Sequence, residues 1–292
     1  MSFLSRYEEL GEIVDVEVKP KPSLRINTLK IEESKAIAIL KKKQVKLEKI
    51  PFVPHGYWYE AEFSLGATPE YLQGWYYLQE TASQLSPIVL DPKKEDIVLD
   101  MAAAPGSKTT QIAQLMKDKG VIVALDNDAM RLISLKNNVE RLGITSVLAY
   151  KKDARFTYDL GIKFDKILLD APCSGNYCIE QNYFTKKTVA GIEQRARLQK
   201  ELLKSAYKSL KQDGILVYST CSLEPEENEL IIDWFLEKFE DMQLQETGLT
   251  IGDKGLTKVF DQELNKEIEK TRRFWPHKTK TQGFFIAKLH KK

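Results

Sequence analysis

Residues 97–113 read IVLDMAAAPGSKTTQIA and indicate an α/β fold. A short apolar run ends in Asp100, a turn of small residues follows, and a helix-like segment starts near Lys108. Small residues let a ligand approach the backbone, and a helix N-terminus offers it unpaired N–H groups. The turn contains neither G-x-G-x-x-G nor G-x-x-x-x-G-K-[ST], which argues against NAD and ATP. We therefore predict a different ligand at the carboxyl end of this strand.

Apolar runs alternate with longer amphipathic segments from about residue 94 onward. The runs expected as strands are 97–100, 121–126, 147–150, 164–170, 215–220 and 284–289. The segments expected as helices are 108–117, 128–142, 192–210 and 226–239. Strands separated by helices predict βαβ units and a mostly parallel, Rossmann-like sheet.

The first 90 residues have a different pattern. We expect a strand over 24–29, a helix over 32–42, an aromatic strand region over 51–63 and a joining helix over 81–90. The sequence thus predicts a small α+β module over residues 1–85 and the sheet domain over residues 86–292.

Acidic residues follow three successive predicted strands. Asp100 ends the first, Asp126 the second, and Asp153 comes just after the third. Each alone is explained as a surface or capping residue, but parallel strands bring all three to one sheet edge. An acid after the second strand is suited to a ribose diol, and Asp153 to an adenine amino group. Together they predict a nucleoside site.

Two cysteines follow two further predicted strands. FDKILLDAPCSG places Asp170 and Cys173 past one strand, and GILVYSTCS places Cys221 past another. A lone cysteine is usually a buried structural residue. These two lie in polar, small-residue segments at strand ends, where neighbouring strands would bring both thiols to one cleft. The residues alone do not decide which thiol would attack a substrate.

The chain resembles the Sun-type RNA (cytosine-5) methyltransferase family, including its archaeal tRNA members. The resemblance rests on motifs spread over nearly the whole chain: RINTLK (25–30), LQETAS (78–83), AAPGSK (103–108), DAPCSG (170–175), STCS (219–222) and RFWPHKTKTQGFFIAKL (273–289). It implies a seven-stranded S-adenosylmethionine methyltransferase domain that methylates carbon 5 of a cytosine in RNA. Cys221 would attack carbon 6, and Cys173 would assist release of the product.

The resemblance also implies further site residues. Asp170 corresponds to the acid that hydrogen-bonds N3 of the base, and Lys108 would lower a thiolate pKa or hold Asp170. The implied cofactor residues are Ala102, Ala103, Ala104, Pro105, Gly106, Ser107, Lys108, Asp126, Arg131, Asp153 and Asp170. Two positions depart from the family: Ala102, where many relatives have a cysteine, and Asn176–Tyr177 after DAPCSG, which puts the target preference in doubt.

RNA contacts are expected from basic and aromatic segments. The net charge is only +2, but residues 19–49 are rich in lysine and carry few acids. This segment is either a solvated face or a phosphate track. Other expected contacts are Tyr57, Trp58, Tyr59 and the segment 272–275, whereas Trp75, Tyr76 and Tyr77 suit an inter-domain core equally well. A compact enzyme favours tRNA as the substrate. The alternatives are rRNA, or a non-catalytic RNA-binding or assembly factor.

The remaining expectations concern metals, compartment and assembly. Three cysteines and three histidines do not match the spacing of a zinc site, so we expect neither a metal nor a disulfide framework. No apolar run approaches the roughly 20 residues of a membrane span, and no secretory signal is present. We expect a cytoplasmic monomer.

Overall fold

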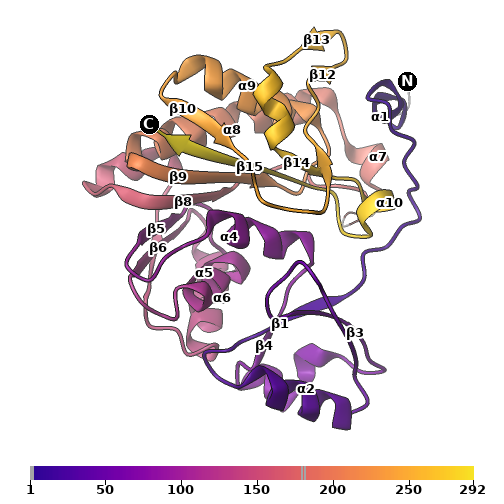
Figure 1. Cartoon of the computed structure of the whole chain (residues 1–292), viewed down its shortest axis with the longest axis vertical. Coiled ribbons are helices and arrows are strands. Elements are labelled where there is room, and N and C mark those ends of the chain that lie inside the picture. The colour runs from indigo at the N-terminus through magenta and orange to yellow at the C-terminus, as the bar shows by residue number, and fades with distance from the viewer. Residues whose placement is uncertain (1–2, 179, 181) are drawn as a thin grey trace.

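The computed structural model describes residues 3–178, 180 and 182–292 and contains one large sheet (Figure 1). Its strands are β5 (Ile97–Asp100), β6 (Val121–Asp126), β7 (Val147–Lys151), β8 (Phe164–Asp170), β9 (Leu210–Thr220), β10 (Met242–Gln245), β11 (Asp253–Lys254), β14 (Arg272–Phe274) and β15 (Phe284–Lys291). Their order is β11-β14-β15-β9-β8-β5-β6-β7, and β10 also pairs with β15.

Strands β5 to β9 are parallel, and the others pair antiparallel. The Rossmann-like, mostly parallel arrangement is therefore confirmed. The expected count of seven strands is wrong for the described residues, because short strands extend the sheet beside β15 to nine.

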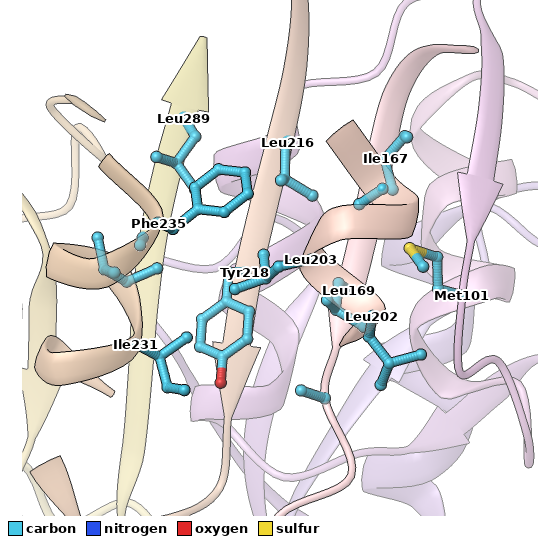
Figure 2. Packing of buried hydrophobic residues seen from close by; sticks show 14 of the residues in the cluster. Met101, Ile167, Leu169, Leu202, Leu203, Leu216, Tyr218, Ile231, Phe235 and Leu289 are labelled. Atoms are coloured by element: carbon cyan, nitrogen blue, oxygen red, sulfur yellow. The ribbon is translucent and has the colours of Figure 1, made fainter. Parts of the chain in front are cut away.

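Helices cover both faces of this sheet (Figure 1). One face carries α4 (Leu85–Leu90), α5 (Ser107–Leu115) and α6 (Ala129–Arg141), and the other carries α8 (Val189–Ser209) and α9 (Glu229–Lys238). Figure 2 shows Leu202 and Leu203 of α8 and Phe235 of α9 packed on the strand residues Leu216 and Tyr218. Burying an aliphatic or aromatic side chain of this kind contributes about 1.5–3 kcal/mol.

Side-chain caps fix where two of these helices begin. The carboxylate of Asp128 accepts hydrogen bonds from the amides of Met130 and Arg131 at the start of α6. The hydroxyl of Thr188 accepts one from Gly191 at the start of α8. Such caps satisfy amides that have no partner within the helix. The helices therefore start close to where the sequence predicts.

The N-terminal module contains a second sheet. Its antiparallel strands are β1 (Ser23–Ile26), β2 (Lys46–Lys49), β3 (Gly56–Glu60) and β4 (Tyr76–Leu78), in the order β2-β3-β1-β4. Helix α2 (Glu33–Lys42) packs against it. Strands β2 and β4 are not evident from the sequence, because three of the four residues of β2 are charged and β4 has only three residues. The expected strand region 51–63 is confined to β3.

The junction between the two sheets is closely packed. Residues 81–90 form a 3₁₀ turn, η2 (Ala82–Gln84), followed by α4, instead of one continuous helix. Ile50, Val53 and Tyr77 of the N-terminal region join the same buried cluster as α4 and α5. The domain boundary at residue 85 stays a prediction.

The first helix, α1 (Ser5–Glu9), lies away from the N-terminal sheet (Figure 1). Tyr7 packs on Leu223 and Trp275 of the large domain. Its hydroxyl donates to the buried carboxylate of Glu224 at 2.7 Å. Residues near the start of the chain thus help to fix the segment that follows Cys221. Separately, no helix among the described residues is long and apolar enough to cross a membrane.

Candidate active site and cofactor cavity

The predicted site residues gather at the carboxyl edge of the parallel strands. Strand β5 ends at Asp100, β6 at Asp126 and β8 at Asp170, and Asp153 follows β7 by two residues. Asp170 of β8 pairs in register with Ser219 of β9. Parallel neighbours deliver their ends to the same side, which is the edge where open α/β sheets bind ligands.

The two cysteines meet at this edge. Cys173 Sγ lies 3.1 Å from Cys221 Sγ, and both residues are half-buried and unoxidised. The contact with Cys221, together with burial, raises the pKa of the Cys173 thiol well above its ordinary value. The two sulfur atoms are therefore close enough to exchange a proton.

Buried polar side chains hold the two cysteine loops. Asn176 Nδ2 donates to the backbone carbonyls of Cys221, at 2.8 Å, and Gly283, at 3.2 Å. The amide and hydroxyl of Ser174 donate to the Glu227 carboxylate at 3.0 and 2.5 Å. Burial raises the pKa of this fully buried Glu227. In the sequence, Asn176 stands out only as a departure from the family, and no motif indicates this contact of Glu227.

Lys108 and Asp170 form an ion pair next to these loops. Lys108 Nζ donates to Asp170 Oδ2 at 2.6 Å and to Ser83 Oγ at 2.9 Å. Ser219 Oγ donates to the other carboxylate oxygen of Asp170 at 2.7 Å. Lys108 was expected either to lower a thiolate pKa or to hold Asp170. The structure shows the contact with Asp170. Neither serine was predicted from the sequence, although Ser83 lies in the LQETAS motif and Ser219 in the STCS motif.

A separate cavity of about 610 Å³ opens at the ends of β5, β6 and β7. Four predicted residues line it: Ala102, Asp126, Arg131 and Asp153. The wall also includes Met101, Asn127, Lys152, Ala154, Arg155, Pro172, Gln194, Arg195, Arg197, Leu198, Glu201 and Leu202. Its volume lies within the range of about 300–1,000 Å³ that is usual for small-molecule sites.

The remaining predicted cofactor residues do not line this cavity. The residues outside its lining are Ala103, Ala104, Pro105, Gly106, Ser107, Lys108 and Asp170. Residues 103–107 shape the loop between β5 and α5 instead. The amide of Ala104 donates to Asp126 Oδ2 at 3.3 Å, and Gly106 has a φ of +105° where α5 begins. A Cβ at Gly106 would lie 2.7 Å from Leu135 Cδ1, so this close packing against α6 requires glycine.

The acceptors in the cavity suit a nucleoside. Asp126 is buried, and its carboxylate lies 3.4 Å from the Arg131 guanidinium. Hydrogen bonding to Arg155 lowers the pKa of Asp153, which keeps that carboxylate ionised. Ionised carboxylates accept hydrogen bonds from hydroxyl and amino groups. Both carboxylates can therefore accept hydrogen bonds from a ligand, and the assignment of Asp126 to a ribose and of Asp153 to an adenine amino group stays a prediction.

One expected RNA contact is wrong. Within the segment 272–275, Arg273, Phe274 and Trp275 are buried. The Arg273 guanidinium pairs with Glu229 and also donates to the carbonyl of Leu223 at 2.6 Å. It therefore stabilises the interior and does not face a phosphate.

The other residues expected to contact RNA differ in their surroundings. Tyr76 and Tyr77 are core residues, and Trp58 is half-buried with its indole N–H bonded to Thr81. Within the lysine-rich segment, several lysines pair with acids: Lys21 with Glu48, Lys43 with Glu70, Lys46 with Glu60 and Lys49 with Glu33. These pairs favour the solvated face, and contact between residues 19–49 and RNA stays a prediction. Among the described residues, no group of three or more His, Cys, Asp or Glu side chains is placed to hold a metal.

Two protein families match successive parts of the chain. Residues 87–290 match the 16S rRNA methyltransferase RsmB/F, and residues 3–81 match the N-terminal domain of 16S rRNA methyltransferase RsmF. Together they cover both sheets of the structure.

Similar proteins act on more than one class of RNA. A 28S rRNA (cytosine-C(5))-methyltransferase of Mus musculus is 41% identical over 97% of this chain and 37% of its own length. A tRNA (cytosine(49)-C(5))-methyltransferase of Pyrococcus abyssi is 40% identical over 93% of this chain and 88% of its own length. The chain thus spans little more than a third of the mouse relative.

Solved structures share the whole fold. A methyltransferase homologue from Pyrococcus horikoshii superimposes with a TM-score of 0.86 at 41% identity, covering 98% of this chain and 90% of its own. NSun6 from the same organism, solved with SFG, gives 0.87 at 32% identity, covering 99% and 95%.

Proposed function

Because the chain belongs to the RsmB/F family of methyltransferases, we propose that it methylates carbon 5 of a cytosine in RNA. The cofactor is S-adenosylmethionine, which supplies an electrophilic methyl group when bound. The observation that carries the proposal is the pair of thiols, 3.1 Å apart, beside the Lys108–Asp170 ion pair. A fold that only bound RNA would need neither.

Cysteine chemistry answers a specific difficulty of this reaction. Carbon 5 of cytosine is a weak nucleophile, so a thiolate first adds to carbon 6. A bond forms between sulfur and carbon 6, and the electron pair of the 5,6 double bond becomes available at carbon 5. Once carbon 5 carries the methyl group, a base removes its proton. The electrons of that C–H bond restore the double bond as the sulfur leaves.

The family resemblance supports Cys221, in the STCS motif, as the attacking thiol. Cys173 Sγ lies 3.1 Å from Cys221 Sγ, so it is placed to exchange a proton with its neighbour. We assign addition to Cys221 and assistance in product release to Cys173.

Lys108 and Asp170 supply polar groups for the base. Asp170 ends β8, three residues before Cys173, and is assigned to the N3 side of the cytosine, where a proton donated by its carboxyl group would relieve the negative charge that develops during addition. Lys108 holds one oxygen of this carboxylate. Cytosine in a duplex is hidden from such groups, so the target must be unpaired or flipped.

We favour tRNA as the substrate, supported by the similarity to the P. abyssi tRNA methyltransferase along 88% of that protein. The second candidate is rRNA, supported by the mouse relative. A non-catalytic RNA-binding or assembly factor is the alternative from another class.

Incubation with S-adenosylmethionine labelled in its methyl group tests these candidates. Separate reactions receive tRNA, rRNA and DNA, and nucleosides are analysed after digestion. The proposal expects label in 5-methylcytosine from an RNA pool, with tRNA the better substrate. Label in rRNA alone would reverse the choice of RNA, and label in neither RNA would refute the enzymatic function.

A further inference from the structure

Two buried serines hold the Lys108–Asp170 pair from opposite sides. Ser83 Oγ accepts a hydrogen bond from Lys108 Nζ, and Ser219 Oγ donates one to Asp170 Oδ1. Ser83 is 8% exposed, and Ser219 is fully buried. The four side chains form one continuous series: Ser83, Lys108, Asp170 and Ser219.

We infer that Ser83 and Ser219 are positioning residues for the methyl-transfer reaction, acting through Lys108 and Asp170. This inference rests on the proposed function. An ammonium group has three N–H donors, of which Ser83 and Asp170 each engage one. The Phe284 ring, 5.5 Å from Lys108 Nζ, limits the space on another side. The long lysine side chain is thus held in one orientation.

The carboxylate is fixed in the same way. One oxygen of Asp170 faces Lys108 and the other faces Ser219, so rotation of the group would break both hydrogen bonds. Ser219 precedes Cys221 by two residues, which ties this orientation to the strand that carries the proposed nucleophile. Groups held before the substrate arrives need not reorganise during the reaction.

Ser83 comes from the segment that joins the two sheets. Glu80 secures its turn by accepting hydrogen bonds from the amides of Ser83, at 3.1 Å, and Gln282, at 3.0 Å. Gln111 of α5 donates to the carbonyl of Gln84 at 2.8 Å. The N-terminal segment therefore contributes directly to the geometry of the cleft.

This contact gives the N-terminal region a function besides RNA binding. If Ser83 acted only in RNA binding, its loss would raise KM. As a positioning residue, its loss lowers kcat, because the RNA still binds while Lys108 is less well oriented.

The test compares hydroxyl-deleting and hydroxyl-retaining variants of the full chain. Ser83→Ala and Ser219→Ala are expected to lower kcat by about 10- to 100-fold, the effect of a small misplacement of reacting groups, with little change in KM for RNA. Ser83→Thr and Ser219→Thr retain the hydroxyl and should recover much of the loss. If Ser219→Thr folds poorly, the comparison of Ser83→Ala with Ser83→Thr decides the question, because the surroundings of Ser83 are less crowded than those of Ser219.

Ser205→Ala is the matched control. Ser205 is also a buried serine, but its hydroxyl bonds to Thr157 of the 3₁₀ segment Ala154–Leu160, and neither residue contacts Lys108 or Asp170 in the hydrogen bonds of the structure. Its loss should lower the unfolding temperature and leave kcat unchanged. Wild-type kcat in both alanine variants, or a loss confined to KM, would overturn the inference while leaving the proposed function intact. An inactive wild-type protein in the same assay would overturn both.

Discussion

Asn176 Nδ2 donates a hydrogen bond to the backbone carbonyl of Cys221 at 2.8 Å. Since Asn176 follows Cys173 by three residues, this bond connects the two loops that carry the thiols. The same amide bonds to Gly283 at the start of the neighbouring strand β15. The short distance between the sulfur atoms is therefore supported by a buried side chain as well as by strand order.

Asn176→Ala should loosen the two cysteine loops. Two buried carbonyls would lose a donor, and each hydrogen bond contributes about 0.5–1.5 kcal/mol. We expect a loss of about 1–3 kcal/mol in the free energy of unfolding, measured in urea, together with a lower kcat. Asn137→Ala, at an exposed position of α6, is the control. If Asn176→Ala and Asn137→Ala had the same stability and activity, Asn176 would not connect the two cysteine loops.

Cys221→Ala should abolish methyl transfer and spare cofactor binding. The change removes the proposed nucleophile, which lies outside the lining of the cofactor cavity. Turnover with labelled cofactor and calorimetric titration with S-adenosylmethionine measure the two properties. Cys178→Ala, which removes the third thiol, should retain activity. Appreciable turnover by Cys221→Ala would refute the assignment.

Asp126→Asn should weaken S-adenosylmethionine binding. A hydrogen bond to a charged group contributes about 1.5–3 kcal/mol, so the Kd should rise by about 10-fold or more. Asp128→Asn is the control, because Asp128 caps α6 outside the cavity and asparagine caps a helix equally well. If both variants bound the cofactor like the wild type, Asp126 would not belong to the site.

Arg273→Met should destabilise the fold strongly. Arg273 and Glu229 are both fully buried, and removing one member of such a pair leaves an uncompensated charge, at a cost of about 3–5 kcal/mol. The exposed pair Lys46–Glu60 provides the comparison. Lys46→Met should change the free energy of unfolding by less than about 1 kcal/mol. Similar stability in both variants would indicate that Arg273 is not buried.

Strand ends were the most predictable part of the site. Periodicity locates apolar strands, and parallel pairing then requires Asp100, Asp126 and Asp170 to reach one edge. The same reasoning brings Cys173 and Cys221 together. It does not give the distance between the two sulfur atoms, because this distance depends on contacts between the loops.

Residues that depend on distant partners were not predictable. Arg273 and Trp275 resemble exposed RNA contacts in the sequence, yet Arg273 is buried because Glu229 lies against it, 44 positions away. In the sequence, the lysines of residues 19–49 have no evident partners. The fold supplies acidic ones, such as Glu60 on β3 for Lys46 and Glu33 at the start of α2 for Lys49. Ser83 acquires its place only when the N-terminal region packs on α5.

The attachment site of trapped RNA tests the central claim most directly. Cys173→Ala removes the thiol assigned to product release, so the variant should accumulate a covalent protein–RNA adduct when given substrate RNA and S-adenosylmethionine. A denaturing gel detects this adduct, and mass spectrometry of its nuclease- and protease-digested peptides locates the modified residue. The account predicts a nucleotide on Cys221. A trapped adduct in Cys221→Ala instead, with the nucleotide on Cys173, would contradict it.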